Sequence, residues 1–129
     1  LSRYVFYLTR SFLPGIKRSF ARNSHDDSFL RFLREHDCLQ ARTLPTAWVA
    51  AMADYQQRFA GAAQSGVPVQ IIQGTDDGTV DWRKNLPLIR EKFPACHAHM
   101  LDDARHHLVN ESAVFRERLF ARLAGIIGP

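Results

Sequence analysis

The first part of the chain has apolar residues at a helical spacing. Leu1, Tyr4, Val5, Leu8 and Phe12 fall on one face, so the pattern predicts a helix over residues 1–12. Pro14-Gly15 interrupts this pattern, and Ile16 and Phe20 continue it loosely among basic residues. We therefore expect a helical N-terminal region.

Two further helices follow in the first half of the chain. The apolar run Phe29–Leu33 predicts a short helix that ends near His36-Asp37, with Ser24 as its capping residue. After an irregular stretch from Cys38 to Pro45, Thr46 is expected to cap a longer helix. The apolar stripe of that helix is predicted to lie in the core and consists of Trp48, Met52, Tyr55 and Phe59.

The second half alternates strands and helices. A β-branched apolar run predicts a buried strand over residues 67–73, and His97–Leu101 predicts a second strand. Between them, Asp81 is expected to cap a helix that starts late, near Asn85, or bends there because of Pro87. Asn110 is expected to open the last helix, whose buried side would comprise Val114, Phe115, Leu119, Phe120, Leu123, Ile126 and Ile127.

This order of elements predicts a βαβ unit and an α/β fold. Parallel strands carry functional residues in the loops at their carboxyl ends. Asp77 follows the first predicted strand and His106 follows the second. We therefore expect these two side chains to lie close together at one edge of the sheet.

Composition adds three constraints. No run of eighteen apolar residues occurs, so we expect no membrane span. The two cysteines, Cys38 and Cys96, lie in different segments and are expected to be reduced, as in a cytosolic protein. The formal net charge of +4 is concentrated at the front, where residues 1–25 contain five basic residues and no acidic ones. This asymmetry indicates contact with an anionic surface, substrate or nucleic acid.

Three carboxylates lie in the loop after the first strand: Asp76, Asp77 and Asp81. A carboxylate that orients an imidazole and stabilises its charged form is one part of a catalytic triad. The alternative is structural, because the same aspartates can close the turn and cap the next helix. A metal site is a further alternative, since His97, His99, His106 and His107 supply four imidazoles, but their spacing matches no compact zinc signature.

The pair of loops resembles part of a known family. Residues 67–111, VPVQIIQGTDDGTVDW followed by DDARHHLVNE, resemble the last two strand–loop units of the α/β-hydrolase fold, in the branch of lysophospholipases and monoacylglycerol lipases. Gly74-Thr75-Asp76-Asp77 matches the G-x-x-D motif, with Asp77 in the place of the triad acid. Ala104-Arg105-His106 matches the turn before the triad histidine, although some members have glycine where this chain has Asp103. The order of acid and then histidine also agrees with that fold.

By the same resemblance, residues 1–44 correspond to a helical cap region and residues 45–129 to the C-terminal portion of the hydrolase core. The family's G-x-S-x-G nucleophile elbow has no counterpart among the serines at 2, 11, 19, 24, 28, 65 and 112. We therefore expect this chain to be a C-terminal piece of a longer protein and to be inactive alone. Its two strands would leave a bare sheet edge, so we also expect it to self-associate.

The resemblance implies an ester hydrolase with a Ser-His-Asp triad, of which this chain carries the catalytic residues Asp77 and His106. It implies an acyl ester or lipid substrate, possible peripheral membrane contact, no cofactor and no nucleic-acid partner. A cytoplasmic location is the corresponding expectation. The alternative is a non-catalytic interaction or anionic-membrane-surface module that uses the basic N-terminal segment.

Overall fold

The computed structural model describes residues 15–18 and 21–128. Within these ranges the chain forms two compact units. The first contains residues 15–18 and 38–62, and the second contains residues 21–37 and 63–128. The predicted helix over residues 1–12 lies outside the described residues. The predicted boundary at residues 44 and 45 between a cap and a core stays a prediction.

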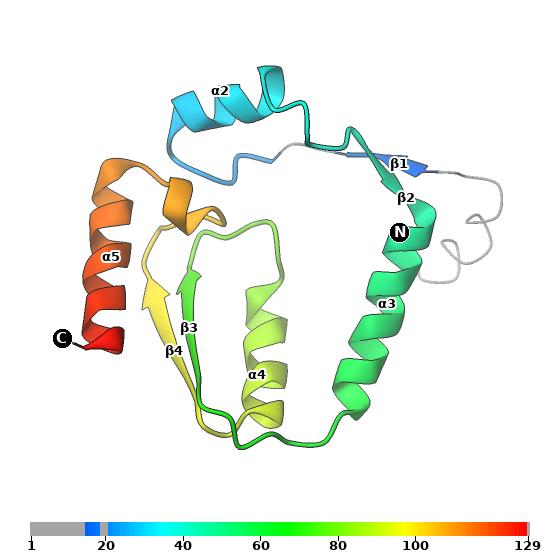
Figure 1. Cartoon of the computed structure of the whole chain (residues 1–129), viewed down its shortest axis with the longest axis vertical. Coiled ribbons are helices and arrows are strands. Elements are labelled where there is room, and N and C mark those ends of the chain that lie inside the picture. The colour runs from blue at the N-terminus through cyan, green and yellow to red at the C-terminus, as the bar shows by residue number, and fades with distance from the viewer. Residues whose placement is uncertain (1–14, 19–20, 129) are drawn as a thin grey trace. The chain divides into compact units, whose positions relative to one another are not determined.

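A short antiparallel sheet and a long helix form the first unit (Figure 1). Strand β1, Gly15–Lys17, pairs with strand β2, Thr43–Pro45, and Ile16 lies opposite Leu44. Helix α3, Thr46–Gly61, follows β2 directly. The expected helical continuation through Ile16 is therefore wrong, because its backbone is part of a strand ladder. The stretch expected to be irregular likewise ends in a strand.

The burial predicted for α3 is also wrong. Trp48 and Tyr55 are 52% and 59% exposed, and no residue of this helix is buried. Thr46 is the first helical residue and not the cap, since Pro45 occupies the capping position and provides no side-chain hydrogen bond. Helical spacing shows which residues share a face of a helix, but it does not show what packs against that face.

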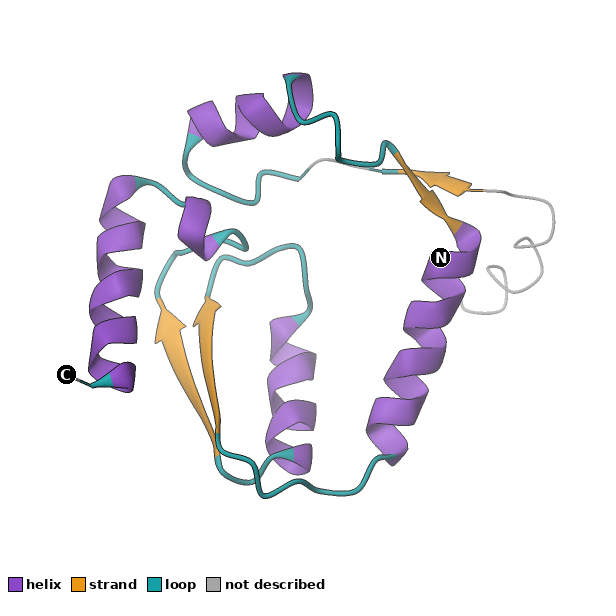
Figure 2. Ribbon diagram, in the orientation of Figure 1, coloured by secondary structure: helices purple, strands orange, loops and turns teal. Residues whose placement is uncertain are grey.

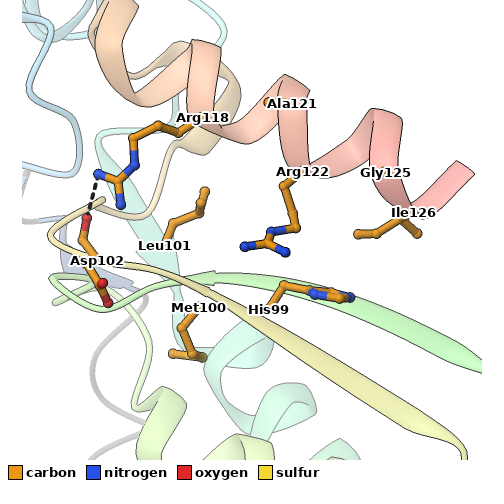
Figure 3. A pocket seen from close by; sticks show the side chains of 9 residues that line it. All are labelled: His99, Met100, Leu101, Asp102, Arg118, Ala121, Arg122, Gly125 and Ile126. Carbon is orange, nitrogen blue, oxygen red and sulfur yellow. Dashed lines mark hydrogen bonds between the residues drawn. The ribbon is translucent and has the colours of Figure 1, made fainter. Parts of the chain in front are cut away.

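The second unit contains the predicted βαβ arrangement. Strand β3, Val69–Gly74, and strand β4, Cys96–Leu101, pair in parallel, and helix α4, Trp82–Lys92, lies in the connection between them. Helix α5, Ala113–Ile127, and α4 lie on opposite faces of this sheet (Figures 1 and 3). Figure 2 shows the same helices and strands by type. A two-stranded parallel sheet with flanking helices is compatible with the α/β class.

Helix α4 starts earlier than predicted. Asp81 caps it as expected, because its carboxylate accepts a hydrogen bond from the Lys84 backbone N–H at 3.4 Å. The helix nevertheless begins at Trp82, and Pro87 lies inside it. The helix tolerates Pro87 as its sixth residue, since the φ angle of proline suits a helix, at the cost of one backbone hydrogen bond. The prediction of a start near Asn85 is therefore wrong.

The core of the second unit lies between the sheet and α5. Leu101, Ala104 and Leu119 are buried together. Four partly buried residues pack against them: Ile72, Leu108, Phe115 and Leu123. A 3-10 turn, η1, spans Leu108–Asn110, so α5 begins at Ala113 and not at Asn110. Three residues predicted to be buried are instead exposed: Val114, Phe120 and Ile127.

Helix α2, Asp27–Glu35, belongs to the second unit, and its C-cap is His36, in agreement with the predicted end near His36-Asp37. Its cap is Asp26, whose carboxylate accepts from the backbone N–H groups of Ser28 and Phe29. Ser24, the predicted cap, instead donates its hydroxyl to the carbonyl of Asn110 at 2.7 Å. Ser24 therefore joins the segment before α2 to the η1 turn, a long-range contact that local sequence patterns do not reveal.

Candidate active site

The candidate site lies where β3 and β4 end. The loop after β3 and the loop after β4 are joined by backbone hydrogen bonds from Thr75 N–H to the Leu101 carbonyl and from Asp76 N–H to the Ala104 carbonyl, each 3.0 Å long. Gly74 ends β3 directly against the backbone of Ala104. The two loops therefore form one continuous surface at the carboxyl edge of the sheet.

Asp77 and His106 meet on this surface. The Nδ1 atom of His106 lies 3.0 Å from Oδ2 of Asp77. The Asp77 side chain is 4% exposed and the His106 side chain is 35% exposed. We call this pair the Asp77–His106 dyad. The structure therefore brings together the two residues that the sequence singled out, with the acid buried and the imidazole reaching solvent.

The surroundings of Asp77 favour its ionised form. Burial raises the pKa of its carboxyl, but hydrogen bonds from His106, from the Gln73 side chain and from the backbone N–H groups of residues 79 and 80 outweigh this effect and lower it. An ionised carboxylate only accepts hydrogen bonds. The Nδ1 atom of His106 must therefore carry the proton, and in the neutral ring Nε2 is the basic nitrogen.

The ring of His106 is the first of three rings in successive contact. The ring of His107 meets the ring of His106 edge-on, with 5.4 Å between their centroids. Phe29 of α2 meets His107 in the same way at 5.3 Å. A chain of ring contacts therefore runs from His106 through His107 to Phe29 of α2, which belongs to the same unit.

The other two candidate acids have structural roles. Asp76 Oδ2 accepts a hydrogen bond from Arg105 Nε at 3.0 Å and remains largely exposed. Asp81 caps α4 and pairs with Lys84. Within the described part of the chain, Asp77 is therefore the carboxylate of this loop that contacts a histidine.

Asp103 has an unusual backbone conformation. Its φ angle is 63°, in the left-handed region that favours glycine. Its backbone N–H donates to the hydroxyl of Thr75 at 2.8 Å, which ties the two loops together. This conformation gives a physical reason why a glycine is suited to this position, and aspartate is among the residues that tolerate it.

A metal site does not form among the described residues. The Nε2 atom of His99 lies 2.8 Å from the Gln70 side-chain oxygen. No group of three or more metal-binding side chains occurs in the parts of the chain that the structure describes. The four histidines considered from the sequence therefore do not gather there into a ligand set.

The basic front segment is only partly described. Arg3 and Arg10 lie outside the described residues. Arg22 forms an exposed ion pair with Asp27 at 3.1 Å. Within residues 15–18 and 21–128, no helix has the length and apolar character needed to cross a bilayer. The hypothesis of an interaction or membrane-surface module stays a prediction.

One residue near the dyad was missed by the sequence analysis. Glu111 has a fully buried side chain that accepts hydrogen bonds from the backbone N–H groups of His25, Arg105 and Ser112. The ring of His25 also lies against this carboxylate and stacks on Phe115. A buried acid five positions after the histidine leaves no periodic signal, so only its tertiary contacts identify it.

The two buried carboxylates predict how stability depends on pH. For Glu111, burial raises the pKa, but hydrogen bonds chiefly from the backbone of His25 and Arg105 outweigh it, so the pKa is lowered, as it is for Asp77. A lowered folded-state pKa adds stability above the ordinary carboxyl pKa of about 4, and this contribution is lost as pH falls through the folded-state value. We expect the urea concentration at the unfolding midpoint, measured by tryptophan fluorescence, to decrease as the pH is lowered below about 4. A midpoint that rises with acidification would contradict this.

A separate groove lies between β4 and α5 (Figure 3). It has a volume of about 510 Å³ and is lined by Asp102 and by residues of these two elements, among them His99, Arg118 and Arg122. Arg118 donates a hydrogen bond to the carbonyl of Asp102 at 3.1 Å. Neither Asp77 nor His106 lines this groove, so it is distinct from the dyad.

Neither a scan against protein-family models nor a search of curated proteins gave a match for this chain.

Proposed function

We propose that this chain supplies the acid and the base of a Ser-His-Asp proton relay in a serine hydrolase that cleaves acyl esters. The observation that carries this proposal is the 3.0 Å contact between His106 Nδ1 and the buried Asp77 carboxylate. A buried carboxylate that fixes the tautomer and orientation of a partly exposed imidazole is the arrangement such a relay requires. The resemblance of the two loops to the α/β hydrolases supports the same interpretation.

In this mechanism Nε2 of His106 removes the proton from a serine hydroxyl as its oxygen attacks the ester carbonyl carbon. Asp77 stabilises the imidazolium that forms. The imidazolium then gives its proton to the leaving alcohol as the ester C–O bond breaks, and an acyl-enzyme remains. Water, activated by the same imidazole, releases the carboxylic acid and regenerates the serine. No cofactor takes part in these steps.

The serine would come from an upstream segment, because no serine of this chain lies in a G-x-S-x-G elbow. We call this chain joined to such a segment the extended protein. Lysophospholipids and monoacylglycerols are the substrate classes that we propose, following the family resemblance.

Labelling with a fluorophosphonate tests the proposal. This reagent phosphonylates a serine only where a neighbouring base activates it. We expect the extended protein to take up about one equivalent, in line with one activated nucleophile, and to hydrolyse p-nitrophenyl esters until labelled. The 129-residue chain alone should do neither.

Two results would argue against a hydrolase. The first is an extended protein that neither reacts with the fluorophosphonate nor hydrolyses short-chain and long-chain esters. The second is an upstream sequence without a G-x-S-x-G elbow. If the chain instead pelleted with anionic vesicles in a salt-sensitive way and showed no hydrolysis, the surface-module alternative would be favoured.

A further inference from the structure

Glu111 occupies the centre of a hydrogen-bond network behind the dyad. Its side chain is completely buried. Oε1 accepts from the Arg105 backbone N–H at 2.8 Å, and Oε2 accepts from the His25 backbone N–H at 2.7 Å. The Ser112 N–H and the Ser24 hydroxyl lie 3.2 Å and 3.4 Å from Oε2. One carboxylate thus connects the segment at Ser24 and His25 to the distant turn that runs from Arg105 to Ser112.

These contacts fix the backbone on which His106 is mounted. One residue before His106, the backbone is held by the bond from Arg105 N–H to Glu111. The peptide after it is held by the bond from His107 N–H to the Asn23 carbonyl at 2.9 Å. The segment that provides Asn23 is itself anchored, because the next residues bond to Glu111 and to Asn110. Loss of the Glu111 carboxylate would therefore remove the bond before His106 and weaken the anchor of the segment that holds the other side.

Burying the Glu111 carboxylate costs free energy, and the hydrogen bonds that offset this cost also hold the backbone that carries His106. A buried carboxylate loses its hydration, and removing one partner of such a network leaves the other groups unsatisfied. Proton transfer between side chains requires atoms to be held within about 0.5 Å of the productive geometry. Charge-assisted hydrogen bonds to the backbone restrict the position of the His106 ring more tightly than a loop without such bonds would.

We propose that Glu111 is a positioning residue for the His106 base: by holding the Arg105 N–H and the segment before α2, it keeps the imidazole against Asp77. This inference rests on the proposed function, in which His106 is the base. It predicts that loss of the Glu111 carboxylate changes the state of the His106 ring, although the two side chains act only through the backbone between them.

Nitrogen NMR of the whole 129-residue chain tests this inference. At a pH where His106 is neutral, the imidazole ¹⁵N shifts report which ring nitrogen carries the proton. Wild type should show the proton on Nδ1. In Glu111→Gln, we expect the ratio of the Nδ1–H to the Nε2–H tautomer to fall several-fold. The Arg105 amide should exchange with solvent about tenfold faster, which corresponds to about 1.4 kcal/mol. Glu117→Gln, an exposed change on α5, is the matched control.

Two outcomes would overturn the inference. In one, the His106 tautomer ratio in Glu111→Gln equals that in Glu117→Gln. In the other, Arg105 exchange accelerates while the His106 ring is unchanged, which would make Glu111 a structural residue only. If Glu111→Gln fails to fold, Glu111→Asp decides by the same criteria, because it keeps the charge but is one methylene too short to reach all its partners.

This test is independent of turnover. If the fluorophosphonate test fails and the His106 tautomer still responds to Glu111, the hydrolase proposal falls and the positioning contact remains. If labelling succeeds and the tautomer does not respond, only the positioning role falls.

Discussion

Replacing His106 with alanine in the extended protein should lower kcat by about 10⁶, the size of effect seen when the base of a catalytic triad is removed. Among the described residues, His106 provides the ring whose Nδ1 lies 3.0 Å from the Asp77 carboxylate. Without that ring, no base remains at the dyad to accept the serine proton. KM should change little, because the imidazole acts on the reacting atoms more than on substrate binding. Steady-state hydrolysis of a p-nitrophenyl ester measures both parameters.

His107→Ala is the matched control for this prediction. It removes a neighbouring imidazole whose ring contacts are with His106 and Phe29, and it leaves the Asp77–His106 dyad intact. We expect its kcat to stay within about tenfold of wild type, since general surface and packing changes act mainly on stability. Wild-type activity in His106→Ala, or equal losses in both variants, would remove His106 from the mechanism.

The same assay discriminates among the three carboxylates of the loop. Asp77→Asn should lower kcat by about 10⁴, because an amide cannot enforce the Nδ1–H tautomer of His106. Asp76→Asn loses its ion pair with Arg105, and Asp81→Asn loses its ion pair with Lys84 while an asparagine can still cap α4. Neither change touches the dyad, so both should retain most activity. A harmless Asp77→Asn together with a damaging Asp81→Asn would show that the acid was chosen wrongly.

Gly74→Ala should be the most destabilising of the small substitutions near the site, by about 3 kcal/mol or more. A Cβ atom on Gly74 would overlap the carbonyl oxygen of Ala104 and lie 2.7 Å from the Arg105 carbonyl oxygen. These obstacles are backbone atoms of the loop that leads into His106, so no side-chain rotation relieves them. The loops must separate, and the urea midpoint measured by tryptophan fluorescence should fall accordingly.

Gly78→Ala provides the comparison for this substitution. Gly78 lies in the same loop, and a Cβ added there meets nothing within 4 Å. Its unfolding free energy should stay within about 0.5 kcal/mol of wild type, as for surface substitutions elsewhere. If the two alanine variants were equally stable, the close approach of Gly74 to Ala104 would not be a feature of the folded protein in solution.

The close approach also explains the G-x-x-D pattern that identified this loop. Gly74 is required where the end of β3 passes the backbone of Ala104, and Asp77 is reached three residues later, where its carboxylate meets His106. The spacing of the motif is thus the length of loop needed to cross from one strand end to the neighbouring one. Asp103, with its φ of 63°, occupies a second position suited to glycine on the facing loop.

Local patterns in the sequence were sufficient to predict β3, β4 and a helix between them. They were also sufficient to predict that Asp77 and His106 lie close together. These features depend on residue spacing and on the rule that parallel strands end at a common edge, both of which can be read along the chain. The capping role of Asp81 is equally local, because a cap and the N–H group it satisfies lie within one helical turn.

Burial and long-range contacts were decided by the tertiary structure alone. The α3 stripe and Val114, Phe120 and Ile127 have helical spacing yet remain exposed, because spacing does not supply a packing partner. Ser24 and Glu111 lie 87 positions apart and meet in the interior through a network that no local pattern encodes. Residue order along the chain is enough to show which side chains can form the dyad. What holds the dyad in place depends on the fold, because a buried carboxylate takes its donors from whichever segments the packing brings to it.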